Sequence, residues 1–147
     1  MLRDDWGVAA DVWSCPSFNE LRREGLDADR WNLLHPLEPA RVAYVESCLR
    51  ERAGPVVAAT DYMKSYADQI RPFVQNLGKR YRVLGTDGFG RSDSRANLRR
   101  FFEVNRFYVV IAALRALADD GAIKPQVIAD AIGKYGIDVN RPNPATV

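Results

Sequence analysis

The stretch from Tyr81 to Arg100 constrains the fold of this chain more than any other. It opens with a short apolar and β-branched run, 81–84, and continues with three glycines within six residues. Ser92 and Asp93 follow as candidate caps of a helix over about 93–102. A strand, a glycine loop and a capped helix form the repeating unit of open α/β sheets, whose ligands and partners bind at the carboxyl ends of the strands. The sequence therefore predicts a strand followed by a loop suited to binding.

The other predicted elements alternate between strands and helices. Apolar runs bounded by turn residues predict strands at 8–13 and 56–60. A capping box formed by Ser17 and Glu20 predicts a short helix that ends at Gly25, with a loop from there to Leu37. Apolar residues at helical spacing, or a proline at the first turn, predict further helices at 41–52, 62–73, 106–118 and 125–135. The first half of 106–118 is so apolar that a strand is the alternative there.

This alternation predicts an α/β fold, with a mostly parallel open sheet and helices on both faces. A chain of 147 residues suits a single domain over 1–147, with 138–147 as a surface tail because it contains two prolines. Three strands are few, since sheets commonly have about four to six. We therefore expect the domain to be truncated at its N-terminus, with its first strand preceding Met1.

Composition argues against several classes of partner. A net charge of +2 is small, and the basic face formed by Arg91, Arg95, Arg99 and Arg100 is interrupted by acidic residues, so no nucleic acid is expected. No apolar run approaches the ~20 residues of a membrane span, so we expect no membrane partner and a cytoplasmic location. The cysteines at 15 and 48 and the single histidine, His35, do not form a disulfide framework or a zinc site.

The residues alone show no catalytic, cofactor-binding or metal-binding set. The glycines at 85, 88 and 90 reverse the order of the dinucleotide motif, and no P-loop lysine follows them. Neither cysteine has a plausible base. Loops that follow parallel strands meet at one edge of a sheet, where they form a natural contact surface. The candidate interface or anion-binding residues on these loops are Asp61, Tyr62, Lys64, Asp87, Phe89, Arg91, Ser92, Asp93 and Arg95.

Four stretches follow one another in an order that carries a resemblance over essentially the whole chain. They read D-V-W-S-C-P-S-F-N-E-L at 11–21, R-W-N-L-L-H-P at 30–36, A-T-D-Y-M-K at 59–64 and Y-R-V-L-G-T-D-G-F-G-R-S-D-S-R at 81–95. Together they closely resemble the C-terminal domain of the homodimeric, bacterial-type pyruvate dehydrogenase decarboxylase component, a member of the transketolase superfamily.

The resemblance implies a parent enzyme that is an oxidoreductase of pyruvate metabolism. Such a parent uses thiamin diphosphate and Mg²⁺ to decarboxylate pyruvate and then acetylates the lipoyl group of dihydrolipoyl acetyltransferase. The cofactor-anchoring motif, the activating glutamate and the active-site histidines of the family lie upstream, and His35 is not assigned a catalytic role. The resemblance thus implies an accessory domain, inactive alone, whose partners are the rest of its own chain, a second subunit and the acetyltransferase.

An alternative from another class stays open on the sequence. The chain would then be a free-standing binding module that holds an anion or a protein partner on the loop Gly85–Arg95.

Overall fold

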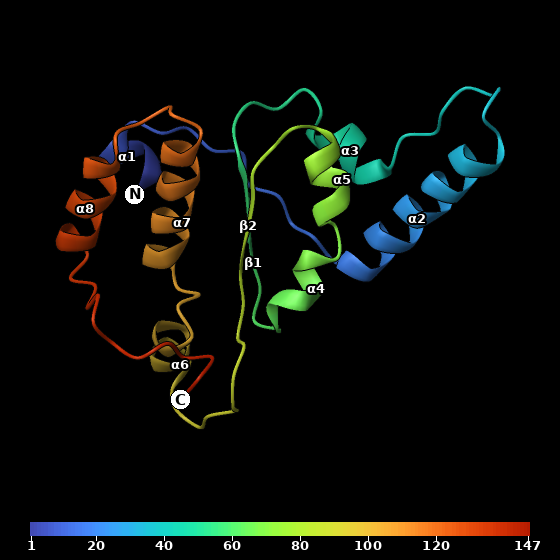
Figure 1. Cartoon of the computed structure of the whole chain (residues 1–147). Coiled ribbons are helices and arrows are strands. Elements are labelled where there is room, and N and C mark those ends of the chain that lie inside the picture. The colour runs from blue at the N-terminus through green and yellow to red at the C-terminus, as the bar shows by residue number, and fades with distance from the viewer.

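Two short parallel strands form the centre of the molecule in the computed structural model, which describes all 147 residues (Figure 1). Strand β1 (Val56–Ala59) pairs with β2 (Tyr81–Leu84) in the register Val56 opposite Tyr81. The remaining elements are α1 (Leu2–Trp6), α2 (Phe18–Leu34), α3 (Tyr44–Leu49), α4 (Lys64–Asp68), α5 (Arg71–Asn76), α6 (Arg95–Phe101), α7 (Arg106–Asp119) and α8 (Pro125–Lys134).

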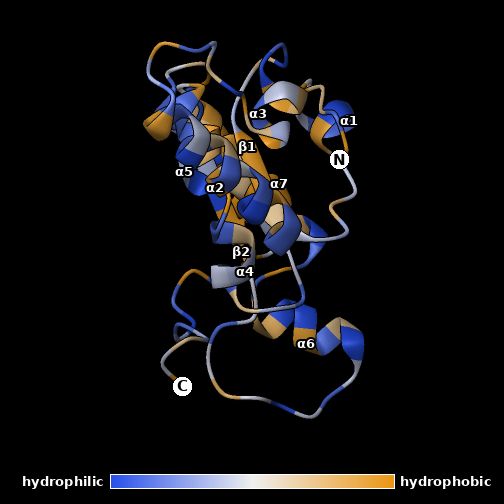
Figure 2. Ribbon diagram, turned by 90° about the vertical axis from the view of Figure 1, so that its right-hand side faces the viewer, coloured by the Kyte–Doolittle hydropathy of each residue, from blue (hydrophilic) through white to orange (hydrophobic).

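Helices cover both faces of this sheet, as the sequence predicts. Helix α7 contacts both strands from one side, and α8 packs on α7. Helices α4 and α5 contact β2 from the other side, where α2 and α3 pack against them (Figure 1). Helix α6 and the C-terminal segment lie together at one end of the molecule (Figure 2). The expectation of a parallel α/β arrangement is confirmed, and no helix is both long and apolar enough to cross a membrane.

Two apolar clusters, one on each side of the sheet, hold these layers together. The larger contains Ile70, Phe73 and Val74 with Tyr81 of β2. The smaller joins α7 to α8, and Trp6 of α1 packs against it. The hydroxyl of Tyr81 donates a 2.6 Å hydrogen bond to the carbonyl of Ala67, which satisfies a polar group inside the larger cluster.

The strand predicted at 8–13 is wrong. This segment is irregular, and none of its backbone N–H groups beyond Val8 donates a backbone hydrogen bond. The side chain of Val12 is 95% exposed and that of Trp13 is 51% exposed. A strand forms only against a partner strand, and here β1 and β2 pair only with each other, so the sheet has two strands rather than three.

The helix predicted to end at Gly25 is also wrong, because α2 continues to Leu34 through most of the expected loop. Gly25 lies against the ring of Phe73, and a Cβ at this position would come within 2.6 Å of the ring. This glycine therefore allows close packing and does not end the helix.

The single helix predicted at 62–73 is two helices, α4 and α5. Pro72 lies in the first turn of α5, where its missing N–H is tolerated, but its ring would clash with a continuous preceding helix. The helix predicted at 41–52 is shorter, since α3 spans Tyr44–Leu49. The helices predicted at 106–118 and 125–135 are confirmed to within a residue.

Candidate functional site

The loops that follow β1 and β2 are fastened side by side, as predicted from the parallel strands. The N–H of Thr60 donates to the carbonyl of Leu84 at 3.0 Å, and the N–H of Thr86 donates to the carbonyl of Tyr62 at 2.9 Å. The hydroxyl of Thr86 adds a 3.0 Å hydrogen bond to the carbonyl of Asp61. The two loops therefore form one surface at the carboxyl end of the sheet.

Gly85 makes this close approach of the loops feasible. A Cβ on Gly85 would lie 2.7 Å from the carbonyl oxygen of Tyr62 and 2.6 Å from the backbone nitrogen of Lys64. Backbone atoms cannot rotate away as a flexible side chain can, so any larger residue would push the loops apart.

Asp87 joins the second loop to the start of α4. Its carboxylate accepts a 2.9 Å hydrogen bond from the N–H of Lys64, and the Lys64 ammonium lies 3.8 Å from the same carboxylate. The free N–H groups at a helix start favour a carboxylate partner. This contact gives Asp87 a structural role, although the sequence does not indicate that Asp87 caps a helix.

Asp61 carries the charge contacts between the first loop and α6. Its carboxylate lies 3.3 Å from the guanidinium of Arg99 and 3.9 Å from that of Arg95. Arg99 also donates to the carbonyl of Val104 at 3.2 Å. Arg99 is not among the site residues predicted from the sequence, although its position four residues after Arg95 on one helix face is a signal that could have identified it.

Asp93 fixes the start of α6. Its carboxylate accepts hydrogen bonds from the N–H of Ser94 at 2.6 Å and from the side-chain amide of Asn97 at 2.9 Å. These hydrogen bonds, that of Asn97 first, hold the pKa of Asp93 below its usual value. The N-cap itself is Ser94, so neither Ser92 nor Asp93 caps the helix as expected.

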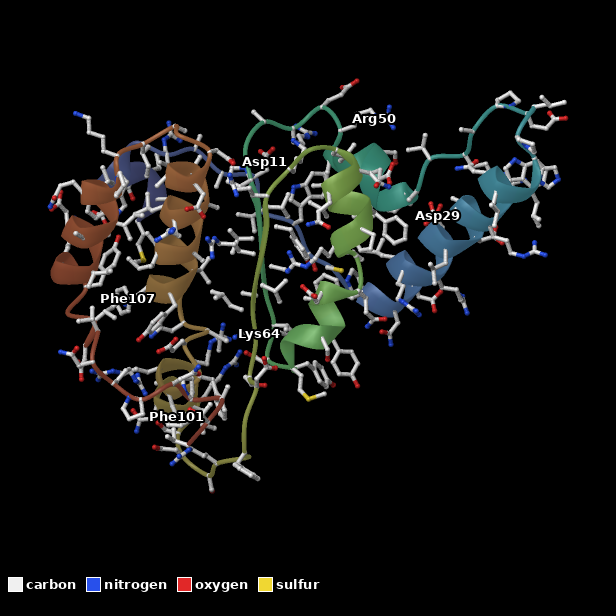
Figure 3. All side chains as sticks on the ribbon, in the orientation of Figure 1. Asp11, Asp29, Arg50, Lys64, Phe101 and Phe107 are labelled. Atoms are coloured by element: carbon white, nitrogen blue, oxygen red, sulfur yellow. The ribbon has the colours of Figure 1, made fainter.

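Phe89, Arg91 and Ser92 lie further along the loop and do not join the contacts of Asp61 with α6 or of Lys64 with Asp87. The guanidinium of Arg91 lies over the ring of Phe101, 4.0 Å from its centroid. Ser92 is exposed, and the side chain of Phe89 is 79% exposed. Figure 3 labels Lys64, at the start of α4, and Phe101, at the end of α6.

The C-terminal tail covers part of the glycine loop, which the sequence did not indicate. Gly88 has a φ of +110°, and a Cβ there would collide with the carbonyl oxygen of Pro144. Arg141 donates to the carbonyls of Arg100 at 3.1 Å and Phe101 at 3.4 Å, at the end of α6. The C-terminal tail therefore contacts both the glycine loop and α6, the helix that follows this loop.

Between the glycine loop and α6 lies a hollow of about 570 Å³. Its charged lining consists of Asp61, Arg91, Asp93, Arg95 and Arg99, and its apolar lining includes Phe89 and Leu98. Arg99 and Arg95 lie against Asp61, and Arg91 lies on an aromatic ring, so all three cations already have partners. No three His, Cys, Asp or Glu side chains of the chain lie together as a metal site requires. The arrangement is suited to contact with another surface.

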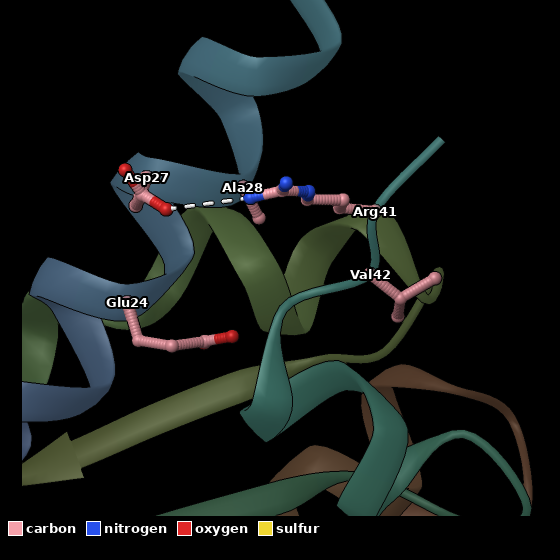
Figure 4. A pocket seen from close by; sticks show the side chains of 5 residues that line it. All are labelled: Glu24, Asp27, Ala28, Arg41 and Val42. Atoms are coloured by element: carbon pink, nitrogen blue, oxygen red, sulfur yellow. Dashed lines mark ion pairs between the residues drawn. The ribbon is translucent and has the colours of Figure 1, made fainter. Parts of the chain in front are cut away.

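A second hollow, of about 340 Å³, lies between α2 and the segment that returns from it (Figure 4). The carboxylate of Asp27 lies 3.7 Å from the guanidinium of Arg41, which stacks on the ring of Trp31. Glu24 accepts a 2.8 Å hydrogen bond from the N–H of Tyr44. These charged side chains all have partners within the chain, and their contacts attach the return segment to α2.

Comparison with known proteins agrees with the resemblance read from the sequence motifs. A family model described as "Transketolase-like TK C-terminal domain" matches residues 1–105. The chain is 63% identical over 144 residues to the "Pyruvate dehydrogenase E1 component" of Pseudomonas aeruginosa and 57% identical over 147 residues to that of Cupriavidus necator. It is 54% identical over 144 residues to the protein of the same name from Escherichia coli.

These matches cover 98 to 100% of the chain but only 16% of each relative, so the chain spans about one sixth of the proteins it resembles. The relatives are named as pyruvate dehydrogenase components, and a pyruvate dehydrogenase is an oxidoreductase. Nearly the whole length of the chain aligns with one part of each relative. The chain belongs to the transketolase-like C-terminal domain family.

Proposed function

We propose that this chain is the C-terminal accessory and dimerisation domain of a pyruvate dehydrogenase of the acetyl-transferring type. The observation that carries the proposal is the 63% identity, over 98% of the chain, to the E1 component of Pseudomonas aeruginosa. The parent enzyme decarboxylates pyruvate and acetylates the lipoyl group of dihydrolipoyl acetyltransferase, in the cytoplasm. The domain supports the second subunit and the shape of the active-site cleft, and the isolated chain is inactive.

The size of its surface supports a role as part of a larger assembly. The chain exposes 9797 Å² to solvent. A compact monomeric protein of 16.5 kDa exposes about 7,600 Å². The excess of roughly 2,000 Å² exceeds the ~800 Å² that each partner contributes to a standard interface. Such an excess is expected of a domain that is covered by neighbouring domains or subunits.

The residues of this chain do not fit thiamin diphosphate or Mg²⁺. The arginines of the hollow beside the glycine loop already have partners. Its two carboxylates, Asp61 and Asp93, are engaged by arginines and by Asn97 respectively, and no third acidic side chain lies with them to complete a Mg²⁺ site. We propose that other parts of the parent hold both groups. The loops at Asp61–Lys64 and Gly85–Arg95, with exposed Tyr62 and Phe89, would then contact the neighbouring domain or subunit.

A chimaera tests this proposal. This chain replaces the matching 144 residues of the Pseudomonas aeruginosa protein, and pyruvate-dependent acetylation of the lipoyl group is measured. We expect the chimaera to retain most of the activity of the unmodified protein, whereas deletion of the same segment abolishes it. A chimaera that folds and assembles but does not turn over pyruvate would contradict the proposal.

The isolated chain provides a second test. Titration calorimetry with thiamin diphosphate and Mg²⁺ is expected to show no saturable binding, because we propose that other parts of the parent hold both groups. Saturable binding at micromolar concentration would mean that the chain carries part of the catalytic site itself.

The alternative, a free-standing anion-binding module, gains no support from the loop geometry, because Arg91 lies on Phe101 and α6 has only seven residues. Sulfate stabilises most folded proteins through exclusion from their surface. We therefore expect sulfate to raise the melting temperature of the wild type and of Arg91→Ala equally. A gain that disappears in Arg91→Ala would favour the module.

A further inference from the structure

The glycine loop lacks hydrogen bonds in its middle part. Residues 88–92 form none, neither with each other nor with the rest of the chain. Two packing contacts attach this stretch instead. The guanidinium of Arg91 lies over the ring of Phe101, and Gly88 lies against the carbonyl oxygen of Pro144. A segment without hydrogen bonds opens easily, so these two contacts determine where the loop lies.

The C-terminal tail is attached to the molecule at two points. All residues of 138–147 are exposed except Arg141 and Pro144. The only hydrogen bonds between the tail and the rest of the chain are those from Arg141 to the carbonyls of Arg100 and Phe101. The tail therefore contacts α6 through Arg141 and the glycine loop through Pro144.

The chain between these two points is stiff. The rings of Pro142 and Pro144 restrict the backbone on both sides of Asn143. The side chain of Asn143 accepts a 3.0 Å hydrogen bond from the N–H of Ala145, and its carbonyl accepts one of 3.0 Å from the N–H of Thr146. Local chemistry therefore fixes the spacing between the two points of attachment.

Phe101, at the end of α6, joins the two sets of contacts. The guanidinium of Arg91 lies 4.0 Å from the centroid of its ring, and that of Arg141 lies 5.7 Å from it. The tail thus takes part in the Pro144 contact directly and reaches the same ring as the Arg91 contact. Both attachments of the glycine loop involve the tail or the side chain that the tail binds.

The hollow of about 570 Å³ lies between the two elements that the tail connects. Its lining comes from the glycine loop, from α6 and from residues next to them, and no residue of the tail belongs to it. The tail therefore lies outside the hollow and does not close it.

We propose that Arg141–Pro144 is a brace that holds the glycine loop at a fixed distance from α6 and so keeps the hollow between them formed. A surface that is ordered in advance loses less conformational entropy when it binds. The brace therefore prepares the loop, with its exposed Phe89, for contact with a partner.

This inference goes beyond the proposed function and does not depend on it, because the brace consists of contacts within the 147-residue chain. An inactive chimaera would leave the brace standing. A glycine loop that is indifferent to the tail would overturn the brace and leave the proposed function standing.

Limited digestion of the whole chain with trypsin is the test, because proteases cut segments that open. Mass spectrometry follows cleavage after Arg91, in the loop, relative to cleavage after Arg52, which is exposed in the turn before β1. Arg141→Ala should raise the relative rate at Arg91 at least about fivefold, since two hydrogen bonds are lost. The substitution removes no cleavage site, because trypsin does not cut before a proline.

Arg106→Ala is the matched control. This exposed arginine also lies over an aromatic ring, that of Phe107 at 5.1 Å, but it does not contact the tail. The relative rate at Arg91 should stay within about twofold of the wild type, as for other surface changes. Circular dichroism checks that each variant is folded.

Gly88→Ala tests the other point of attachment, because a Cβ there displaces the Pro144 carbonyl. The single variant should also speed cleavage at Arg91, whereas Gly90→Ala, with no atom near its Cβ, should not. If both attachments belong to one brace, the double variant Gly88→Ala/Arg141→Ala is cut no faster than the faster single variant.

Three results would overturn the inference. The first is an unchanged rate at Arg91 in Arg141→Ala. The second is an equal rise after Arg91 and Arg52, which would mean a general loss of stability. The third is a double variant whose rate is the product of the two single effects, which would show that the tail and the glycine act independently.

Discussion

At the scale of single residues, Gly85 determines whether the candidate surface forms. Its missing side chain lets the backbone of Tyr62 and Lys64 pass close enough for the hydrogen bond between Thr86 and Tyr62. We expect Gly85→Ala to lower the free energy of unfolding by about 1–3 kcal/mol, the usual cost of forcing extra atoms into a packed site. Urea unfolding measures this change.

Gly90→Ala is the matched control, because no atom lies within 4 Å of a Cβ at that position. The control is expected to change stability by no more than about 0.5 kcal/mol, as at other surface sites. Equal effects of the two substitutions would show that loop flexibility, and not the close approach to Tyr62, sets the stability.

Asp119 provides a second prediction at this scale. The carboxylate, at the end of α7, accepts from Arg82 of β2 and, at 2.8 Å, from Arg115. The hydrogen bond of Arg82 and then that of Arg115 hold the pKa of Asp119 below its usual value of 3.8. The stabilisation is therefore complete above that pH and is lost as the pH falls through the lowered pKa.

Asp119→Asn should accordingly melt at a lower temperature than the wild type at pH 7, with a difference that shrinks below about pH 4. Thermal unfolding followed by circular dichroism at pH 7 and at pH 3 measures this. A difference that stays constant over that range would assign the effect to packing alone.

At the scale of helices and strands, the elements that were predicted correctly are those that local sequence determines. β1, β2, α7 and α8 have strong local signals, either β-branched runs or apolar residues at helical spacing, and all four were predicted correctly. The length of α2 was missed because its glycine fits the ring of Phe73, which is 48 residues away. The 8–13 segment was missed because a strand depends on a partner that local sequence does not supply.

Hydrogen exchange tests the second of these outcomes. Backbone amides of residues 9–13 donate no backbone hydrogen bond and should exchange rapidly, whereas those of Ala58 and Arg82, within the sheet, should be protected. Equal protection would mean that the segment pairs as a strand in solution, as its sequence suggests.

The site shows the same division between local and distant causes. The pairing of the two loops followed from parallel strand topology, which brings the N–H of Lys64 on the first loop to the carboxylate of Asp87 on the second. The contact of Pro144 with Gly88 was not predictable, because 56 residues separate the two and neither has a side chain that signals the other.

At the scale of the whole molecule, the residues that match the family model end before α7, whereas the folded core includes α7. The family model covers residues 1–105, whereas Leu114 and Ala116 of α7 are completely buried and α7 contacts both strands. We expect the fragment 1–105 to show no cooperative thermal unfolding, because one face of its sheet is uncovered. The fragment 1–137 should stay folded, since it lacks only the tail. A cooperative transition in 1–105 would contradict this assignment of α7 to the core.

Helix α1 meets the end of α8 on the side of α7. The indole N–H of Trp6 donates to the hydroxyl of Tyr135 at 2.7 Å, and that hydroxyl donates to Asp5 at 3.0 Å. Lys134 pairs with the same carboxylate at 2.8 Å. During synthesis, α1 therefore leaves the ribosome long before its partner exists, and contacts between distant residues form late. The packing of α1 must therefore wait until α8, 129 residues further along the chain, has been made and has folded against α7.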